Sequence, residues 1–410
     1  MNTLRFITAG NVDDGKSTLI GRLLYDSDSI HTDQLGVLQK QTKQEGVDID
    51  LSLITDGLRA EREQGITIDV AYKYFSTSKR KFIIADAPGH EQYTRNMITG
   101  ASNSDLIIVL VDARNGITDQ TKRHASVGSL MGIKKAIIAI NKIDLLNYSE
   151  EVFNQIKNDF EAIKSELNYN EIIYIPVSAL VGDNVVTTSE NTPWYNGKSI
   201  LQTLESVELD STEDLEARFQ VQWVIRPKDE DNHDYRGYAG QILSGSYKVG
   251  DKVTILPAKI ETTLVKIEKD LKEVSEVVAG DNVVLHFEND IDISRGDTVV
   301  LSHQLPKEDN QINTWISWLD NNSLQVGKTY LLQHRFKNVR VKVQQINRKW
   351  NVNQWQFTDG DAVQLNDIAQ VTLKTSQPLY YDTFEKNPKS GSAILIDETS
   401  FNTVGALMFL

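Results

Sequence analysis

The chain of 410 residues contains no cysteine, which excludes disulfide bonds, thiolate nucleophiles and thiolate metal sites. It also lacks a long hydrophobic run, because the longest, residues 106–111, is far shorter than the roughly 20 apolar residues that span a bilayer. No apolar core with a small-residue cleavage site follows the first residues. We therefore expect a cytoplasmic protein without a membrane segment.

Positive charge is in deficit, with 43 Lys and Arg against 57 Asp and Glu and a formal net charge of −14. A large nucleic-acid-binding face needs clustered Lys and Arg to neutralise phosphates, so this balance argues against a nucleic-acid partner. A short basic cluster, Lys79, Arg80 and Lys81, is interpreted as a solvated turn between two strands.

The first half of the chain, up to about residue 208, alternates short apolar runs with helical patterns. Strand-helix-strand units of this kind predict an α/β domain with a doubly wound, mainly parallel sheet. The expected strands are residues 4–9, 66–76, 81–87, 105–112, 135–141 and 172–178, and the expected helices include residues 16–24, 119–131 and 150–167.

Beyond about residue 217 the helical periods disappear, and alternating segments are punctuated by glycine. Residues 252–256 and 283–287 belong to a first predicted β-barrel, and residues 339–343 and 371–374 to a second. The predicted domains are residues 1–210, an α/β nucleotide-binding domain, residues 217–304, a β-barrel, and residues 306–410, a second β-barrel.

The strongest motif has the pattern G-x-x-x-x-G-K-S and lies between the first predicted strand and the first helix. Such a loop wraps backbone N–H groups round a phosphate, while its lysine neutralises terminal oxygens and its serine can ligate Mg²⁺. Its residues are Gly10, Asn11, Val12, Asp13, Asp14, Gly15, Lys16 and Ser17, followed by Thr18.

A second motif, Asp86-Ala87-Pro88-Gly89-His90, follows the third predicted strand. Asp86 is expected to hold Mg²⁺ through water, and Gly89 can bring its N–H against a γ-phosphate because it has no Cβ. His90 would then orient the attacking water. We therefore predict Lys16 and His90 as the catalytic residues.

A third motif, Asn141-Lys142-Ile143-Asp144, closes the fifth predicted strand. The Asp144 carboxylate can accept from both the ring N–H and the exocyclic amine of guanine, whereas adenine would leave it unpaired. The sixth strand ends at Ser178-Ala179-Leu180, where a backbone N–H could meet the guanine carbonyl oxygen. This pattern selects guanine over adenine.

Thr67 lies between the phosphate loop and Asp86, after the polar stretch 26–56. Its hydroxyl is expected on Mg²⁺ and its N–H on the γ-phosphate, so that the segment orders with triphosphate and is released after hydrolysis. The predicted ligands are therefore GTP and Mg²⁺, with Ser17, Thr67 and, through water, Asp86 around the metal.

Together these motifs resemble the translation-factor class of GTPases, and more closely the GTPase, or large, subunit of the heterodimeric bacterial sulfate adenylyltransferase (ATP sulfurylase). Asp14 stands where an elongation factor usually has His, and Ala87 stands where the subunit family commonly has Thr. The stretches that carry the resemblance are residues 10–25, 56–72, 88–97, 119–121 and 193–197.

The resemblance implies an elongation-factor-like fold, in which a P-loop GTPase domain precedes two β-barrels. It also implies a partner, a small subunit that transfers the adenylyl group of ATP to sulfate and gives adenosine 5′-phosphosulfate and pyrophosphate. GTP hydrolysis by the large subunit is coupled to this uphill nucleotidyltransferase step of sulfate assimilation. The expected assembly is a heterodimer or a higher assembly built from it.

Two other functions remain open from the sequence. One is a translation GTPase that delivers an aminoacyl-tRNA, against which the net charge and Asp14 count. The other is a regulatory GTPase whose barrels only bind a protein partner. Co-purification of a small adenylyltransferase subunit, of tRNA or of neither distinguishes the three.

Overall fold

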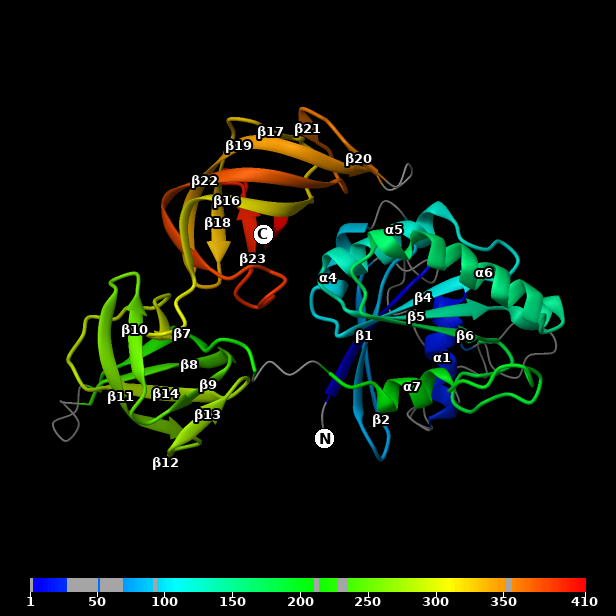
Figure 1. Ribbon diagram of the computed structural model, residues 1–410, viewed down its shortest axis with the longest axis horizontal. Coiled ribbons are helices and arrows are strands. Elements are labelled where there is room, and N and C mark those ends of the chain that lie inside the picture. Colours follow the sequence, from blue (N-terminus) through cyan, green and yellow to red (C-terminus); the bar gives the residue numbers. More distant parts are fainter. Residues whose placement is uncertain are drawn as a thin grey trace. The chain divides into compact units, whose positions relative to one another are not determined.

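The computed structural model describes residues 3–27, 51, 69–90, 94–209, 214–227, 235–351 and 356–410. The chain divides into two compact units, residues 1–209 with 352–354, and residues 210–351 with 355–410. Figure 1 shows helices around a sheet in the first unit and strands in the second. Among the described residues, no helix is long and apolar enough to cross a membrane.

The first unit is built on a six-stranded sheet with the order β2-β3-β1-β4-β5-β6. The neighbours β3-β1-β4-β5-β6 pair in parallel, and β2 runs antiparallel to β3. The predicted mainly parallel sheet is therefore confirmed. Its strands are β1 (Thr3–Ala9), β2 (Ala71–Ser76), β3 (Lys81–Asp86), β4 (Leu106–Asp112), β5 (Lys135–Asn141) and β6 (Glu171–Pro176).

The helices begin at capping residues that the sequence supplies. Thr118 and Ser199 each form a capping box with the residue three positions on, and the Ser149 hydroxyl accepts from the Val152 N–H. The helices are α1 (Lys16–Asp26), α4 (Thr94–Ala101), α5 (Asp119–Leu130), α6 (Glu150–Ile163) and α7 (Ile200–Ser206), with 3-10 turns η3 (Ile143–Leu146) and η4 (Lys164–Glu166).

Most predicted element bounds differ from the observed ones by one or two residues, and three of the differences are informative. The helix expected over 150–167 ends at Ile163, because the chain then tightens into a turn in which the Leu167 N–H bonds to the Lys164 carbonyl. The strand expected over 172–178 ends at Pro176, which has no N–H to donate to a ladder. The strand expected from residue 66 begins, within the described residues, at Ala71.

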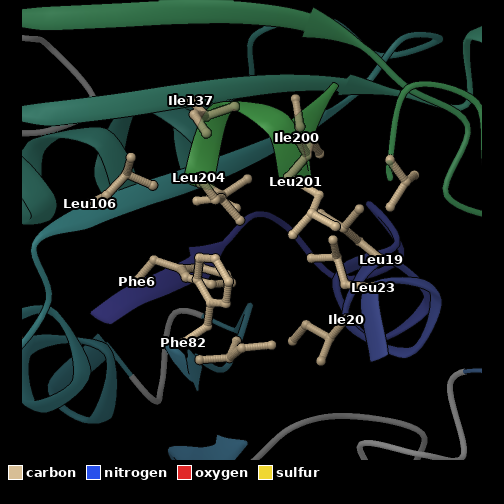
Figure 2. Packing of buried hydrophobic residues seen from close by; sticks show 14 of the residues in the cluster. Phe6, Leu19, Ile20, Leu23, Phe82, Leu106, Ile137, Ile200, Leu201 and Leu204 are labelled. Atoms are coloured by element: carbon tan, nitrogen blue, oxygen red, sulfur yellow. The ribbon is translucent and has the colours of Figure 1, made fainter. Parts of the chain in front are cut away.

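The core of the first unit lies between the sheet and helices α1 and α7 (Figure 2). Phe6 of β1, Phe82 of β3, Leu23 of α1 and Leu204 of α7 belong to one cluster of buried residues. Strand β4 is buried along its whole length, as a continuous apolar run in a sheet covered on both faces should be. This packing fixes the carboxyl ends of the parallel strands at one edge.

The basic cluster near residue 80 lies in the turn between β2 and β3, but it is not wholly solvated as predicted. Lys79 and Lys81 are exposed, whereas Arg80 is buried. Its guanidinium donates to the carbonyl oxygens of Leu204 and Val207, at 2.9 and 2.6 Å. Arg80 therefore satisfies the last carbonyls of α7, which no further helical turn could pair.

The second unit contains two sheets that close on themselves, which confirms the two predicted β-barrels. The first has the order β10-β15-β7-β8-β14-β11-β12 and closes through β10 and β11, and the second has the order β18-β23-β24-β16-β22-β19-β20 and closes through β18 and β19. Each encloses its own hydrophobic cluster. The exact domain boundaries remain a prediction.

The strands of the first barrel are β7 (Arg218–Ile225), β8 (Gly237–Ser244), β9 (Ser246–Lys248), β10 (Lys252–Leu256), β11 (Ile260–Lys269), β12 (Lys272–Val274), β13 (Glu276–Val278), β14 (Asn282–Phe287) and β15 (Thr298–Leu301). Those of the second are β16 (Lys307–Trp318), β17 (Leu324–Gln325), β18 (Thr329–His334), β19 (Lys337–Asn351), β20 (Gln356–Thr358), β21 (Ala362–Val363), β22 (Ile368–Tyr381), β23 (Ser392–Ile396) and β24 (Thr403–Phe409).

A buried ion pair joins the two barrels. The Nε and Nη2 atoms of Arg218 donate to the two carboxylate oxygens of Asp382 at 2.9 and 2.8 Å. Both side chains are buried, and Arg218 also donates to the backbone carbonyl of Gln304. Burial alone would raise the pKa of Asp382, but the hydrogen bond and charge of Arg218 outweigh it and lower this pKa.

Candidate nucleotide-binding site

The predicted motifs converge at one edge of the first unit's sheet. Strands β1, β3, β5 and β6 run in the same direction, and each motif follows one of them. The register pairs Thr8 with Asp86 and Asp112 with Asn141, so residues far apart in the chain lie side by side. Ligands of open α/β sheets bind at such an edge.

The phosphate loop has a backbone conformation that favours glycine. Gly15, immediately before α1, has a φ of 94°, and Asp13 also lies in the left-handed region with a φ of 68°. A Cβ at Gly15 would collide with the side-chain nitrogen of Asn141. The loop therefore opens helix α1 with backbone N–H groups unused by the helix, an arrangement that suits an anion.

Lys16 is a buried cation held by the loop itself. Its Nζ donates to the carbonyl oxygens of Gly10 and Asn11 at 3.0 and 2.8 Å. Burial lowers its pKa, and the charges of Asp86 and Asp14 counteract part of this effect. Among the described residues Lys16 forms no ion pair, so a bound phosphate would supply the negative charge that it needs.

Asp14 turns its carboxylate into the loop. The side chain is buried, and its Oδ2 accepts from the Asn11 N–H at 2.6 Å. Burial raises its pKa, although the hydrogen bond to Asn11 and the charge of Lys16 counteract this. The side chain thus stabilises the loop conformation.

The second motif lies directly against the phosphate loop. Asp86 is buried at the end of β3 and accepts from the Thr8 hydroxyl at 3.3 Å. An added Cβ at Gly89 would lie 2.5 Å from the Lys16 Nζ and 2.8 Å from the Gly10 carbonyl oxygen. Only glycine fits such a close approach. His90 follows with an exposed side chain.

Gln120 of α5, to which the sequence analysis gave no role, contacts the second motif, and His124 of the same helix contacts Gln120. The side-chain amide of Gln120 donates to the Gly89 carbonyl at 3.1 Å and lies 3.1 Å from the Nε2 atom of His124. Burial lowers the pKa of His124 to about 3, and the charges of Lys16 and Arg123 act in the same direction. A neutral histidine therefore supports the glutamine that holds Gly89.

Asn141 links the base-recognition motifs to the phosphate loop. Its side-chain nitrogen donates to the Asp14 carbonyl at 2.7 Å, and its side-chain oxygen accepts from the Ala179 N–H at 2.9 Å. The Ala179 amide, in the stretch where the sequence predicts a contact with the guanine carbonyl, is therefore paired with Asn141. Ser178 is buried and accepts from the Val181 N–H.

Lys142 is held by a carboxylate that sequence reasoning missed. Its Nζ lies 2.9 Å from Oδ2 of Asp112, a buried residue at the end of β4 that also accepts two hydrogen bonds from the Arg114 guanidinium. Burial alone would raise the pKa of Asp112, but the hydrogen bonds from Arg114 and Lys142 lower it well below its usual range. The only sequence signal for Asp112 was its position at the end of a predicted strand, residues 105–112, that no motif follows.

Asp144 lies in the 3-10 turn η3 with its side chain half-buried. Lys142 precedes this turn in the left-handed conformation, with a φ of 61°. The Leu145 N–H bonds to the Lys142 carbonyl, so the residues after β5 form a compact turn that follows Asn141. This is the place at which the sequence predicts guanine recognition.

The predicted magnesium donors are only partly within the described residues. Ser17 is the second residue of α1 and the Asp86 carboxylate is buried at the end of β3, whereas Thr67 lies outside the described residues. In the described part of the chain, no group of three or more His, Asp or Glu side chains could hold a metal. These donors fit Mg²⁺, which takes one or two protein oxygens together with phosphate oxygens and water.

Two family models match the chain. Residues 1–217 match the elongation factor Tu GTP binding domain, and residues 311–409 match the GTP-eEF1A C-terminal domain-like family. The first match contains every residue of the site described above. The second corresponds to the second barrel.

Curated relatives match over almost the whole chain. Sulfate adenylyltransferase subunit 1 of Alteromonas mediterranea is 47% identical over 99% of this chain and 86% of its own length, and that of Teredinibacter turnerae is 48% identical with the same coverage. The bifunctional enzyme CysN/CysC of Mycobacterium tuberculosis H37Rv is 46% identical over 99% of this chain and 67% of its own length. The chain therefore belongs to the sulfate adenylyltransferase subunit 1 family, with an elongation factor Tu type GTP-binding domain.

Proposed function

We propose that the chain is the GTP-hydrolysing subunit of a sulfate adenylyltransferase. Its nucleotide would occupy the carboxyl edge of the first sheet, with the triphosphate on the loop that contains Lys16. The observation that carries the proposal is this buried lysine, which forms no ion pair among the described residues and lies against Gly89 of the second motif. The proposed contacts are Gly10, Asn11, Val12, Asp13, Asp14, Gly15, Lys16, Ser17, Thr18, Thr67, Asp86, Gly89, Asn141, Lys142, Asp144, Ser178, Ala179 and Leu180.

The base would be read by Asp144. Its carboxylate accepts from the two N–H groups that guanine presents, and the Leu180 amide donates to the guanine carbonyl. Lys142 covers the base with its aliphatic stem, because the ion pair with Asp112 holds its ammonium group. Adenine would leave the carboxylate unpaired, so it is rejected.

Hydrolysis would depend on Lys16, Gly89 and His90. Lys16 neutralises charge that develops on the phosphate oxygens, and the Gly89 N–H donates to the γ-phosphate. His90 orients the attacking water toward the γ-phosphorus, which loses its bond to the β-γ bridging oxygen. Gln120 restrains the Gly89 carbonyl and so limits the orientations of this turn.

Magnesium, when bound, neutralises phosphate charge. Ser17 and Thr67 would hold it by their hydroxyls, and Asp86 would hold it through water. The contact between Asp86 and the Thr8 hydroxyl restrains the carboxylate at the edge of the sheet. The Asp86 carboxylate thus lies near the charge of Lys16, and β3 would not need to move for this carboxylate to hold the metal through water.

The coupled reaction would take place on a small partner subunit. That subunit transfers the adenylyl group of ATP to sulfate, which is strongly uphill, and GTP hydrolysis on this chain drives it. The names of the relatives support a subunit role, because they denote subunit 1 of sulfate adenylyltransferase. The partner and the coupling belong to the proposal, as does a cytoplasmic location.

The test measures adenosine 5′-phosphosulfate formed from ATP and sulfate by the chain co-expressed with its candidate small subunit, with and without GTP. A second arm uses the Asp144→Asn variant with xanthosine triphosphate, whose carbonyl replaces the exocyclic amine of guanine. We expect GTP to raise product formation for the wild type and xanthosine triphosphate to do so for the variant. The matched control, Asp159→Asn on the exposed face of α6, should keep the dependence on GTP.

An active small subunit that does not respond to GTP would reject the proposed coupling. Co-purification of tRNA with the chain would instead indicate a translation GTPase. Stimulation of the variant by GTP alone would show that the coupled nucleotide does not bind through Asp144. The first result concerns the reaction, and the third concerns the pocket.

A further inference from the structure

The outer face of the second barrel carries a cluster of rings and cations that the proposed chemistry does not use. Antiparallel register places both Trp315 of β16 and Arg348 of β19 opposite Gln370 of β22, one on each side. Strand β20 continues the sheet beyond β19 and brings Phe357 opposite Trp350. Four residues from three strands, Trp315, Arg348, Trp350 and Phe357, thus form one cluster.

The side chains of this cluster restrain one another. Trp315 stacks on Phe357 with ring centroids 5.7 Å apart and an interplanar angle of 25°, and Trp350 meets the same ring at 4.9 Å. The guanidinium carbon of Arg348 lies 3.9 Å from the Phe357 centroid, and its Nε donates to the Gln370 side chain at 2.8 Å. Little conformational freedom remains to be lost when a partner binds.

The cluster is accessible on the second unit. Phe357 is 38% exposed, Arg348 is exposed and Trp315 is half-buried. Tryptophan and arginine are the residue types most enriched where a few side chains carry most of the energy of a protein interface. A restrained group of such side chains on a sheet face therefore has the composition of an interface centre.

Two lysines extend the cluster along the same face. Lys342 of β19 and Lys374 of β22 are exposed and directly opposite each other. Like charges in such a cross-strand pair repel. Neither lysine forms an ion pair with any residue that the structure describes, whereas Lys349, on the same strand, pairs with Asp367 at 2.6 Å. The positive charge of this face is therefore not neutralised by neighbouring carboxylates.

Hydrogen-bonded polar residues connect the lysines to the rings. The Thr372 hydroxyl bonds to the side chains of Asn313 and Asn347 on the two flanking strands. Since a strand rises by about 3.3 Å per residue, the face from Lys342 to Arg348 extends over roughly 20 Å. We call this face, formed by Trp315, Lys342, Arg348, Phe357 and Lys374, the cationic strip.

We propose that the cationic strip is the docking surface for the small adenylyltransferase subunit, which presents carboxylates to the two lysines and an apolar side chain to the rings. This inference rests on the proposed function. The chain as a whole carries a net charge of −14, so an acidic partner surface is repelled over most of the molecule and attracted here. The charge pattern therefore selects both the partner and its orientation.

The test measures the dissociation constant between the full-length chain and the purified small subunit. In one variant Lys342→Glu is combined with Lys374→Glu, and in another Arg348→Ala is combined with Phe357→Ala. We expect each to weaken binding by at least about tenfold, and the first also to reduce the salt dependence of the association rate. The control pair, Lys252→Glu with Lys272→Glu on the first barrel, should change binding by less than about threefold.

Intrinsic GTP hydrolysis and the melting temperature of each variant identify any loss of folding. Wild-type affinity in both strip variants, or an equal loss in the control pair, would overturn the docking surface. Binding of an RNA oligonucleotide that the strip variants abolish would also overturn it. A wild-type chain that neither binds the small subunit nor supports GTP-dependent product formation would reject the proposed function as well.

Discussion

Buried charges serve opposite purposes in the two units of this molecule. At the edge of the first sheet, Lys16 is buried against backbone carbonyls, and Asp14 accepts from a backbone N–H. Between the barrels, Arg218 and Asp382 are buried as a bidentate pair. A buried charge with a full partner stabilises a structure, whereas one satisfied only by backbone groups leaves capacity for a ligand.

The surroundings of Lys16 identify the candidate site without a bound nucleotide. Burial alone does not distinguish Lys16 from Arg218, because both are almost fully covered. The distinction lies in the partners and in the backbone, since left-handed residues and a glycine that excludes a Cβ surround Lys16.

The largest effect should follow from Asp144→Asn, which changes the charge available to the base. We expect the preference for GTP over xanthosine triphosphate to change by roughly 10³-fold or more, because a buried mismatch of polar groups is costly. Competition binding with a fluorescent nucleotide measures the ratio. An unchanged ratio would contradict the assigned base pocket, and Asp159→Asn provides the control.

The Arg218→Ala variant tests the buried ion pair between the two barrels. It leaves the Asp382 carboxylate buried without its partner, so the free energy of unfolding should fall by about 3–5 kcal/mol. Denaturant unfolding followed by tryptophan fluorescence measures this change. Combining Arg218→Met with Asp382→Leu should recover much of the loss, whereas Arg340→Ala, which removes the exposed pair with Glu398, should cost less than about 1 kcal/mol.

The same pair makes stability depend on pH. Because Arg218 keeps the folded-state pKa of Asp382 below its unfolded value, this stability is present above the unfolded pKa and is lost as pH falls through the folded pKa. The wild type should therefore lose more stability on acidification than the Arg218→Met, Asp382→Leu variant. Equal losses would mean that the pair is not the acid-sensitive contact.

A smaller effect is expected for His90→Ala. The variant should bind GTP with nearly unchanged affinity and hydrolyse it about 10²-fold more slowly, because only water orientation is lost. Single-turnover hydrolysis measures the rate, and His303→Ala, at an exposed position in the second unit, is the control. Wild-type hydrolysis by the His90 variant would remove this residue from the mechanism.

The smallest effect should come from Asp112→Asn. The variant frees the Lys142 ammonium from its ion pair, so guanine-nucleotide affinity should fall by roughly tenfold while hydrolysis of bound GTP changes little. Asp119→Asn, exposed at the start of α5, should leave affinity unchanged. A loss of hydrolysis at saturating GTP would instead place Asp112 in the chemical step.

The sequence predicted the parts of the site that depend on order along the chain. A parallel sheet brings every strand end to one edge, so motifs that follow successive strands had to meet there. The roles of Asp112 and Gln120 could not be predicted, because each acts on a motif through a contact with a residue distant in the sequence, Lys142 and Gly89 respectively. Arg80 was misinterpreted for the same reason, since its partners are carbonyls at the end of α7.

The barrels were predictable as a class but not in their contacts. Alternating strands and glycine turns indicated two closed sheets, and both are present. The pairing of Arg218 with Asp382, residues 164 positions apart, depends on how two independent barrels pack, which no local pattern encodes. The cationic strip similarly required the register between β16, β22 and β19.

Asn141 has a consequence for how a nucleotide leaves. The Asn141 side chain bonds to both the Asp14 carbonyl and the Ala179 N–H. It therefore links the loop predicted to bind the phosphates with the segment predicted to bind the base. A displacement of either segment is therefore transmitted to the other through this side chain. If the nucleotide binds as proposed, a factor that accelerates its release would need to displace only one of the two segments.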